Sequence, residues 1–191
     1  MLAVVVSLFA SRFVNAAPAP AAAPAATRAA NAAADAGDAD VLATLRPGHP
    51  RLLVLDDDIA RLKRQIADDA TAKRYFDHIR AAGDKMLDLP PSERIIIGPR
   101  LLHISRLVVT RVTTLGGLYR LTGEEKYARR CREEMLAAAN FKDWNPSHFL
   151  DVAEMTSALA IGYDWIFGTL SEEDRATIRT AIVEKGLKPG L

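Results

Sequence analysis

The stretch "LLHISRLVVTRVTTLGGLYRL", Leu101 to Leu121, decides the fold class, because apolar residues occupy most of the circumference of the helix that it would form. A helix that is apolar on every side must be enclosed by other parts of the protein. The next stretch, "EEKYARRCREEMLAAA" from Glu124 to Ala139, is charged along one side and apolar along the other. A capping box of Thr122 with Glu125 is expected to start this second helix, which would cover the first and expose its charges to water.

The same alternation follows once more along the chain. An apolar helix is predicted from about Pro146 to about Phe167, and an amphipathic helix, "EEDRATIRTAIVEK", follows a cap at Ser171 and ends at Gly186. The sequence therefore predicts an all-α fold of double-layered helical hairpins. These hairpins either continue as an open superhelical array or belong to an incomplete (α/α) toroid.

Two more helices are predicted ahead of this pattern. The first is capped by an aspartate of the run Asp56 to Asp58, and the second extends from about Thr71 to Leu87. The segment "RIIIG", Arg94 to Gly98, is a candidate extended piece, and the first enclosed helix is expected to begin near Pro99.

The N-terminal part of the chain has a different composition. Residues 1–17 combine an apolar run with small residues after it, which is typical of an export signal peptide. Residues 18–48 are rich in Ala and Pro and are predicted to be a disordered linker, because they bury too little to offset the entropy of ordering. The helical domain is expected to span residues 49–191. We therefore expect a periplasmic or secreted protein without stable membrane insertion, since the apolar run is too short to span a bilayer.

Charge and cysteine content exclude several classes of protein. The 25 basic and 24 acidic residues give a net charge of +1, so no global field attracts nucleic acid, and no nucleic-acid partner is predicted. A single cysteine, Cys131, excludes an internal disulfide and is expected to be a packing residue. The histidines lack metal-ligand spacing and no phosphate-binding glycine loop is present, so neither a metal nor a cofactor is predicted.

Polar residues gather at the start of the second apolar helix, in "DWNPSHFLDVAEM" from Asp143 to Met155. Asn145 is expected to cap the helix. Trp144 either staples the turn or offers a flat face to a sugar ring. His148 is either a buried histidine that donates to a backbone carbonyl or a glycan contact at the helix N-terminus.

The carboxylates of this helix need partners if they are enclosed. Asp151 and Glu154 are expected to pair with arginines such as Arg106 or Arg111 on the neighbouring apolar helix, because an unpaired buried charge is costly. Tyr163 lies near the other end of the helix, where it could fix the turn onto a neighbouring hairpin.

Three stretches carry a resemblance to a known family: "HPRLL" from His49, "LYRLTGEEKYARR" from Leu118, and above all Asp143 to Leu187. There the chain resembles the N-terminal helical domain of heparinase II/III-like polysaccharide lyases. The resemblance implies an exported protein that combines an (α/α) toroid with a C-terminal β-rich domain and cleaves uronate-containing glycans by β-elimination. It also implies that the catalytic Asn/His and Tyr positions lie mostly beyond Leu191.

The lyase chemistry needs a group that neutralises the uronate carboxylate and a base that removes the neighbouring proton. The partner implied is thus an acidic polysaccharide or oligosaccharide, and the fragment alone is expected to be inactive. An alternative is a non-catalytic helical module that binds a glycan or a protein, and a hydrolase or isomerase on the same toroid is a third possibility. The candidate substrate-binding residues are Trp144, Asn145, His148, Glu154 and Tyr163.

Overall fold

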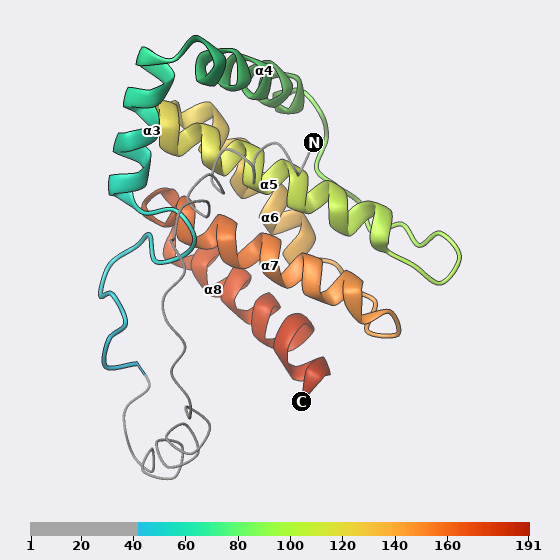
Figure 1. The fold of residues 1–191 in the computed structure, drawn as a ribbon. Coiled ribbons are helices and arrows are strands. Elements are labelled where there is room, and N and C mark those ends of the chain that lie inside the picture. The colour runs from blue at the N-terminus through green and yellow to red at the C-terminus, as the bar shows by residue number, and fades with distance from the viewer. Residues whose placement is uncertain (1–41) are drawn as a thin grey trace, which may run out of the picture.

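The structure is a computed structural model that describes residues 42–191, and within this range every regular element is a helix (Figure 1). An isolated bridge between Ile97 and Arg100 is the remaining β-type pairing in these residues. The α-helices are α3 (Asp56–Asp68), α4 (Ala70–Leu87), α5 (Leu102–Thr122), α6 (Glu125–Ala139), α7 (Phe149–Trp165) and α8 (Glu172–Ala181). Short helical turns follow at Phe167–Thr169, Ile182–Leu187 and Lys188–Gly190. The all-α prediction is confirmed.

Helices α5 and α7 lie side by side and run in the same direction (Figure 1). At their N-terminal ends, the backbone N–H of Leu101 donates to Asp151 and the Ser105 hydroxyl donates to Glu154. At the other end, Gly116 of α5 packs against the Trp165 ring of α7. Contacts at both ends in matching order make the pair parallel, so its two N-termini lie at one end of the molecule.

Helices α6 and α8 return alongside this pair. The Cys131 thiol of α6 lies against the Val112 carbonyl of α5, and Arg132 of α6 binds Asp174 at the start of α8 through two hydrogen bonds of 2.7 and 2.9 Å. Cys131 is fully buried, as predicted, and burial raises the pKa of its thiol to about 12.

The main core lies between these four helices. Its largest fully buried apolar residues are Trp144, Tyr127, Leu101, Leu115, Leu118, Met135, Met155, Leu159, Ile166, Ile178 and Val108. Val152, Met155, Leu159 and Ile166 are all buried along α7, as the helical periodicity predicts.

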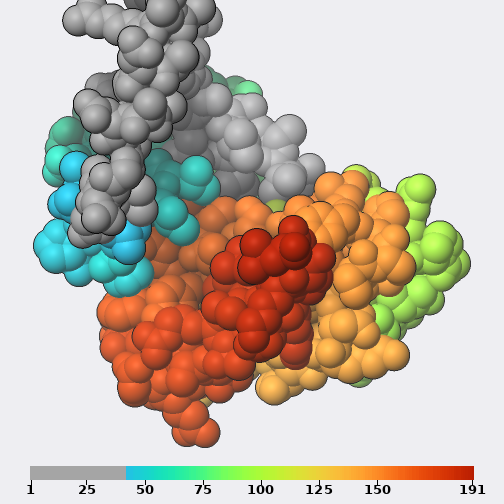
Figure 2. Space-filling view, turned by 90° about the horizontal axis from the view of Figure 1, so that it is seen from below, coloured from blue at the N-terminus to red at the C-terminus, as the bar shows by residue number. Residues whose placement is uncertain are grey.

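The C-terminal residues fold back over the start of α7, as Figure 2 shows for the red C-terminal segment against the orange one. Gly186 packs against Thr156 and Trp144, and Gly190 packs against the Phe149 ring. Lys185 donates to the carbonyl oxygens of Ala139 and Phe141 and so caps the end of α6.

The segment that joins α4 to α5 is held by a buried ionic cluster. Glu134 accepts hydrogen bonds from Arg111, Arg130 and the backbone N–H of Ser92, and all four residues are buried. The two arginines also donate to the carbonyl of Pro90. These bonds fix the segment, whose tip at Ile95, Ile96 and Ile97 is exposed.

Several helix ends differ from the sequence predictions. Thr122 ends α5 and does not start α6, because Gly123 with φ +76° forms a left-handed cap between them. Leu55 occupies the N-cap position of α3, so the predicted aspartate cap is wrong. Asp58, inside the first turn, accepts a hydrogen bond from the Leu55 N–H. Ser171 caps α8 as predicted, through a capping box with Asp174.

Three further boundaries are also corrected. Helix α5 begins at Leu102 and not near Pro99, and α7 begins at Phe149 and not at Pro146. Helix α8 ends at Ala181, but a π-helical turn continues to Leu187, past the predicted stop at Gly186.

The proposed signal peptide, 1–17, and most of the proposed linker, 18–48, lie outside the described residues. Residues 42–48 are exposed and contain turns but no helix. Within residues 42–191, no helix is both long enough and apolar enough to cross a membrane.

Candidate functional site

The candidate site lies where the N-terminal ends of α5 and α7 meet. Asp151, on the first turn of α7, is completely buried, and its Oδ2 accepts from the Leu101 N–H and from the Asn145 side-chain amide, both at 2.7 Å. Asn145 Nδ2 also donates to the Pro99 carbonyl at 2.9 Å. Asp151 therefore ties the start of α7 to the start of α5, and the predicted pairing of Asp151 with an arginine is wrong.

His148 stands in front of this buried carboxylate. Its Nδ1 lies 3.1 Å from Asp151 Oδ1, although both atoms are buried and neither makes a hydrogen bond of good geometry. The His148 side chain keeps 26% of its surface exposed, so the imidazole edge that carries Nε2 faces outward. A carboxylate that lies behind one imidazole nitrogen can orient the ring for proton transfer at the other nitrogen.

Glu154 lies one turn further along α7. Its Oε2 accepts from the Ser105 hydroxyl at 2.6 Å, and its Oε1 lies 3.3 Å from Arg106 Nε. The predicted pairing of Glu154 with Arg106 is confirmed, whereas Arg111 binds Glu134 instead. Arg106 is 63% exposed, so its guanidinium can reach a ligand at the rim of the site.

Trp144 does not face a ligand. It is fully buried, its indole N–H donates to the Ala138 carbonyl at 3.0 Å, and its ring contacts Gly186. The prediction that Trp144 stacks on a sugar ring is wrong, because the end of α6 and the C-terminal segment cover the indole.

Asn145 has a structural role different from the predicted cap. Residue His148 occupies the N-cap position of α7, and Asn145 lies three residues earlier with φ +58°, a conformation that asparagine tolerates better than most residues. Its side chain is buried and is hydrogen-bonded to Pro99, Asp151 and Ser147. Asn145 therefore links the loop before α7 to the start of α5 and presents no free amide to solvent.

Asp143 and Arg94 close one side of the site. Arg94 Nη2 lies 2.6 Å from Asp143 Oδ1, which also accepts from the Asn145 N–H at 2.8 Å. Burial acts to raise the pKa of Asp143, but these two donors outweigh it and hold the pKa below its ordinary value. Asp143 thus stays ionised and keeps the loop before α7 attached to the segment before α5.

Tyr163 lies at the opposite end of α7, far from His148. Its ring contacts His49 and Phe167 edge to face, with centroids 5.8 and 5.4 Å apart. The adjacent Asp164 accepts from His49 Nδ1 at 2.6 Å and from the N–H groups of residues 51 and 52. The structure therefore places two candidate substrate-binding residues, Tyr163 and His148, at opposite ends of α7.

The end of the molecule where α5 and α7 begin carries the features of an anion site. Two helix N-termini contribute partial positive charge there, and Arg106, Arg100 and His103 are exposed beside them. Asp143 and Glu154 pair with Arg94 and Arg106, and Asp151 Oδ2 accepts from backbone and amide donors, whereas Asp151 Oδ1 has only His148 beside it. Such a site can bind a carboxylate and can hold or transfer a proton at His148.

Among the described residues, no group of three His, Cys, Asp or Glu side chains is arranged to hold a metal ion. Neither a comparison with protein-family models nor one with curated protein sequences finds a match for this chain. The site is therefore interpreted from its own geometry.

Proposed function

We propose that this chain is the N-terminal part of an (α/α) toroid in an exported polysaccharide lyase, and that the joined N-termini of α5 and α7 form one wall of its glycan cleft. The observation that carries the proposal is the placement of His148 in front of the buried Asp151 at the point where two parallel helices begin. Parallel enclosed helices whose N-termini share one end are also what the inner layer of a toroid requires.

The positive groups of this wall indicate an acidic substrate. In the proposal, the free N–H groups of the helix N-termini and the exposed Arg106 guanidinium bind the carboxylate of a uronate residue. Neutralising that carboxylate makes the adjacent C–H proton more acidic, which β-elimination requires. Glu154 lies beside Nε of Arg106, so in the proposal the two terminal guanidinium nitrogens of Arg106 meet the uronate, while Ser105 donates to the other oxygen of Glu154.

His148 acts on the same substrate as a donor or a proton carrier. Asp151 stands behind Nδ1, so the outward Nε2 is the nitrogen that a sugar hydroxyl or glycosidic oxygen would meet. The resemblance implies that the remaining groups, an Asn/His pair and a Tyr, come from residues after Leu191. This chain supplies the carboxylate-binding wall in the proposal.

The test uses the protein encoded by the whole reading frame that contains this chain. Purified protein is incubated with pectate, alginate, hyaluronan and heparan sulfate, and the unsaturated uronate product is followed by its ultraviolet absorbance. Arg106→Ala should lower kcat/KM by about tenfold or more, because it removes a charge-assisted contact of about 1.5–3 kcal/mol. Arg61→Ala, which removes an exposed arginine of α3, is the matched control and should leave turnover unchanged.

Two outcomes separate the alternatives. Tight glycan binding with no unsaturated product supports a non-catalytic binding module. Cleavage that yields saturated products supports a hydrolase on the same scaffold. Equal turnover by the wild type and by the Arg106 and His148 variants contradicts the assignment of this wall.

A further inference from the structure

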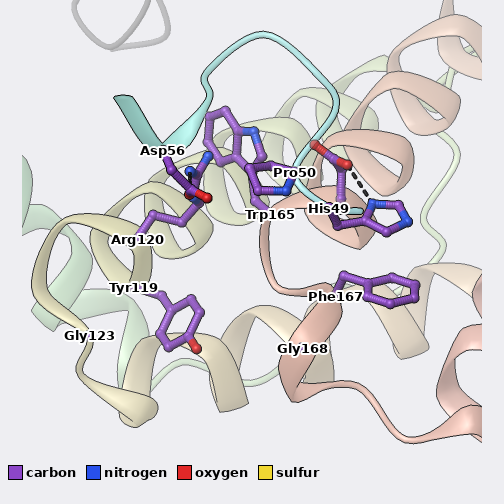
Figure 3. Close-up of a pocket in the computed structure, with 10 residues that line it drawn as sticks. His49, Pro50, Asp56, Tyr119, Arg120, Gly123, Trp165, Phe167 and Gly168 are labelled. Carbon is purple, nitrogen blue, oxygen red and sulfur yellow. Dashed lines mark hydrogen bonds and ion pairs between the residues drawn. The ribbon is translucent and has the colours of Figure 1, made fainter. Parts of the chain in front are cut away.

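A second concave site lies at the opposite end of α5 and α7, where both helices end. A hollow of about 360 Å³ opens there, close to the lower limit of the roughly 300–1,000 Å³ typical of small-ligand sites (Figure 3). Tyr119 and the largely buried Trp165 supply aromatic surface, and Asp56 supplies an exposed carboxylate.

The fold itself does not require a glycine at position 168, in the wall of this hollow. A Cβ built on Gly168 meets no atom within 4 Å, and its φ is not in the positive range that favours glycine. Neither packing nor backbone geometry therefore requires a glycine there. A bare backbone at this position does keep the hollow open and lets a ligand approach the chain closely.

The hollow also contains unused hydrogen-bonding groups. Within residues 42–191, the Tyr119 hydroxyl makes no hydrogen bond and its side chain is partly exposed. Asp56 is 83% exposed and uses Oδ1 to bind Arg120 at 2.8 Å, which leaves Oδ2 open. In Figure 3 the Tyr119 ring and the Asp56–Arg120 pair flank the space beneath Trp165. A ligand with several hydroxyl groups would find both donors and acceptors here.

Charge argues against an anionic ligand at this end. The C-termini of α5 and α7 carry partial negative charge, and Asp56 keeps one carboxylate oxygen outside its pair with Arg120. A cation is also disfavoured, because the Arg120 guanidinium lines the hollow and the Arg175 guanidinium lies 3.9 Å from the centre of the Phe167 ring, which His49 covers as well. A neutral ligand fits both observations.

From these features we infer that the hollow at the C-terminal ends of α5 and α7 binds a neutral sugar ring. Such a ring has apolar C–H faces for the aromatic walls and hydroxyl groups for Tyr119 and Asp56. The inference does not depend on the proposed lyase activity, because the site lies at the far end of the molecule from His148 and selects an uncharged ligand.

The two tryptophans of the chain provide an internal probe. The indole N–H of Trp165, in the wall of the hollow, donates to the Leu52 carbonyl at 3.3 Å, whereas the indole of Trp144 is buried beside the candidate lyase site. In a ¹H–¹⁵N spectrum of the full chain, the two indole signals are assigned with Trp165→Phe. The protein is titrated separately with methyl glucoside, methyl galactoside, methyl mannoside, methyl glucuronide and tetramethylammonium.

At least one neutral glycoside should shift the Trp165 signal with a millimolar Kd, a usual strength for a small ligand with few contacts, and leave the Trp144 signal in place. Gly168→Leu fills the hollow and should abolish the shift without lowering the unfolding midpoint. Ala153→Leu, at an exposed position of α7, is the matched control and should bind normally. Tyr119→Phe should weaken binding by about two- to tenfold, as expected for the loss of one neutral hydrogen bond.

Three results would overturn the inference: no shift of Trp165 with any neutral glycoside, an unchanged shift in Gly168→Leu, or a response to glucuronide or tetramethylammonium alone. Failure here leaves the lyase proposal intact, since that proposal predicts changes near His148 with uronates. Failure of the lyase proposal likewise leaves the Trp165 result unaffected.

Discussion

Replacing Glu134 by Gln should destabilise the protein strongly, because it removes the one carboxylate that neutralises Arg111 and Arg130. The Arg111 and Arg130 nitrogens lie 3.1 and 2.8 Å from Glu134 Oε2, and all three side chains are buried. Removing one partner of a buried ion pair typically costs about 3–5 kcal/mol, because the remaining charge stays buried without compensation. Gln keeps the shape of the side chain and one acceptor for the Ser92 N–H, so the loss of stability reports mainly the loss of the carboxylate charge.

The free energy of unfolding is measured by urea denaturation at neutral pH, with m-values compared to confirm two-state behaviour. Glu172→Gln is the control, since that side chain is 71% exposed and its pairs with Arg175 and Arg179 lie at the surface. The control should lose less than about 1 kcal/mol. Equal, small losses for both variants would show that solvent reaches the two arginines and would refute the buried cluster.

A triple variant tests whether the uncompensated charge of the two arginines causes the loss of stability. Replacing Glu134, Arg111 and Arg130 together by Met removes the charges and the desolvation cost at the same time, so stability should recover most of the loss seen in Glu134→Gln. A triple variant less stable than the single one would mean that hydrogen bonds to the segment at Leu89 and Pro90 contribute more than charge compensation.

The other predictions concern packing and pH. Leu159→Ala should cost about 2–5 kcal/mol in urea denaturation, because it leaves a cavity in a fully buried site. Gly162→Ala should cost about 1–3 kcal/mol, since the added methyl would overlap Met135, and thermal unfolding would reveal a destabilisation. The Arg132 hydrogen bond lowers the pKa of Asp174, so this carboxylate stabilises the fold above its unfolded pKa and loses that effect as pH falls. The difference in stability between wild type and Asp174→Asn should therefore be constant near neutral pH and shrink below about pH 4.

The sequence was informative about helices and less informative about their ends. Apolar residues at helical spacing predicted α5 and α7 and their main buried faces, but α7 is not enclosed on every side, because Phe149 and Leu150 are exposed. Helix starts were placed less well. Thr122 has a capping pattern with Glu125, yet Gly123 turned the chain there, and a left-handed glycine cap competes with any capping box at the same position.

Whether the stretch from Asp143 to Met155 binds a ligand stays a prediction, but the structure corrects the roles of Trp144, Asn145 and Asp151 within it. Trp144 has the same side chain whether it staples a core or stacks on a sugar, and only the packing of the distant Gly186 decides between these. Asp151 binds the Leu101 N–H and Asn145, a pairing with backbone that no charge pattern indicates. The spacing of His148 and Asp151, three residues apart on a helix, was the signal from which their proximity could have been predicted.

In the proposed function, the N-terminal ends of α5 and α7 bind an acidic glycan. To test this, the full chain is titrated with uronate tetrasaccharides of galacturonan, alginate and hyaluronan while backbone amide shifts are recorded, with cellotetraose as the neutral control. A uronate should shift the amides of His148, Phe149 and Leu102, high salt should weaken the effect, and Arg106→Ala and His148→Ala should reduce it while Arg61→Ala does not. Shifts confined to other parts of the molecule, or equal shifts in all three variants, would contradict the claim.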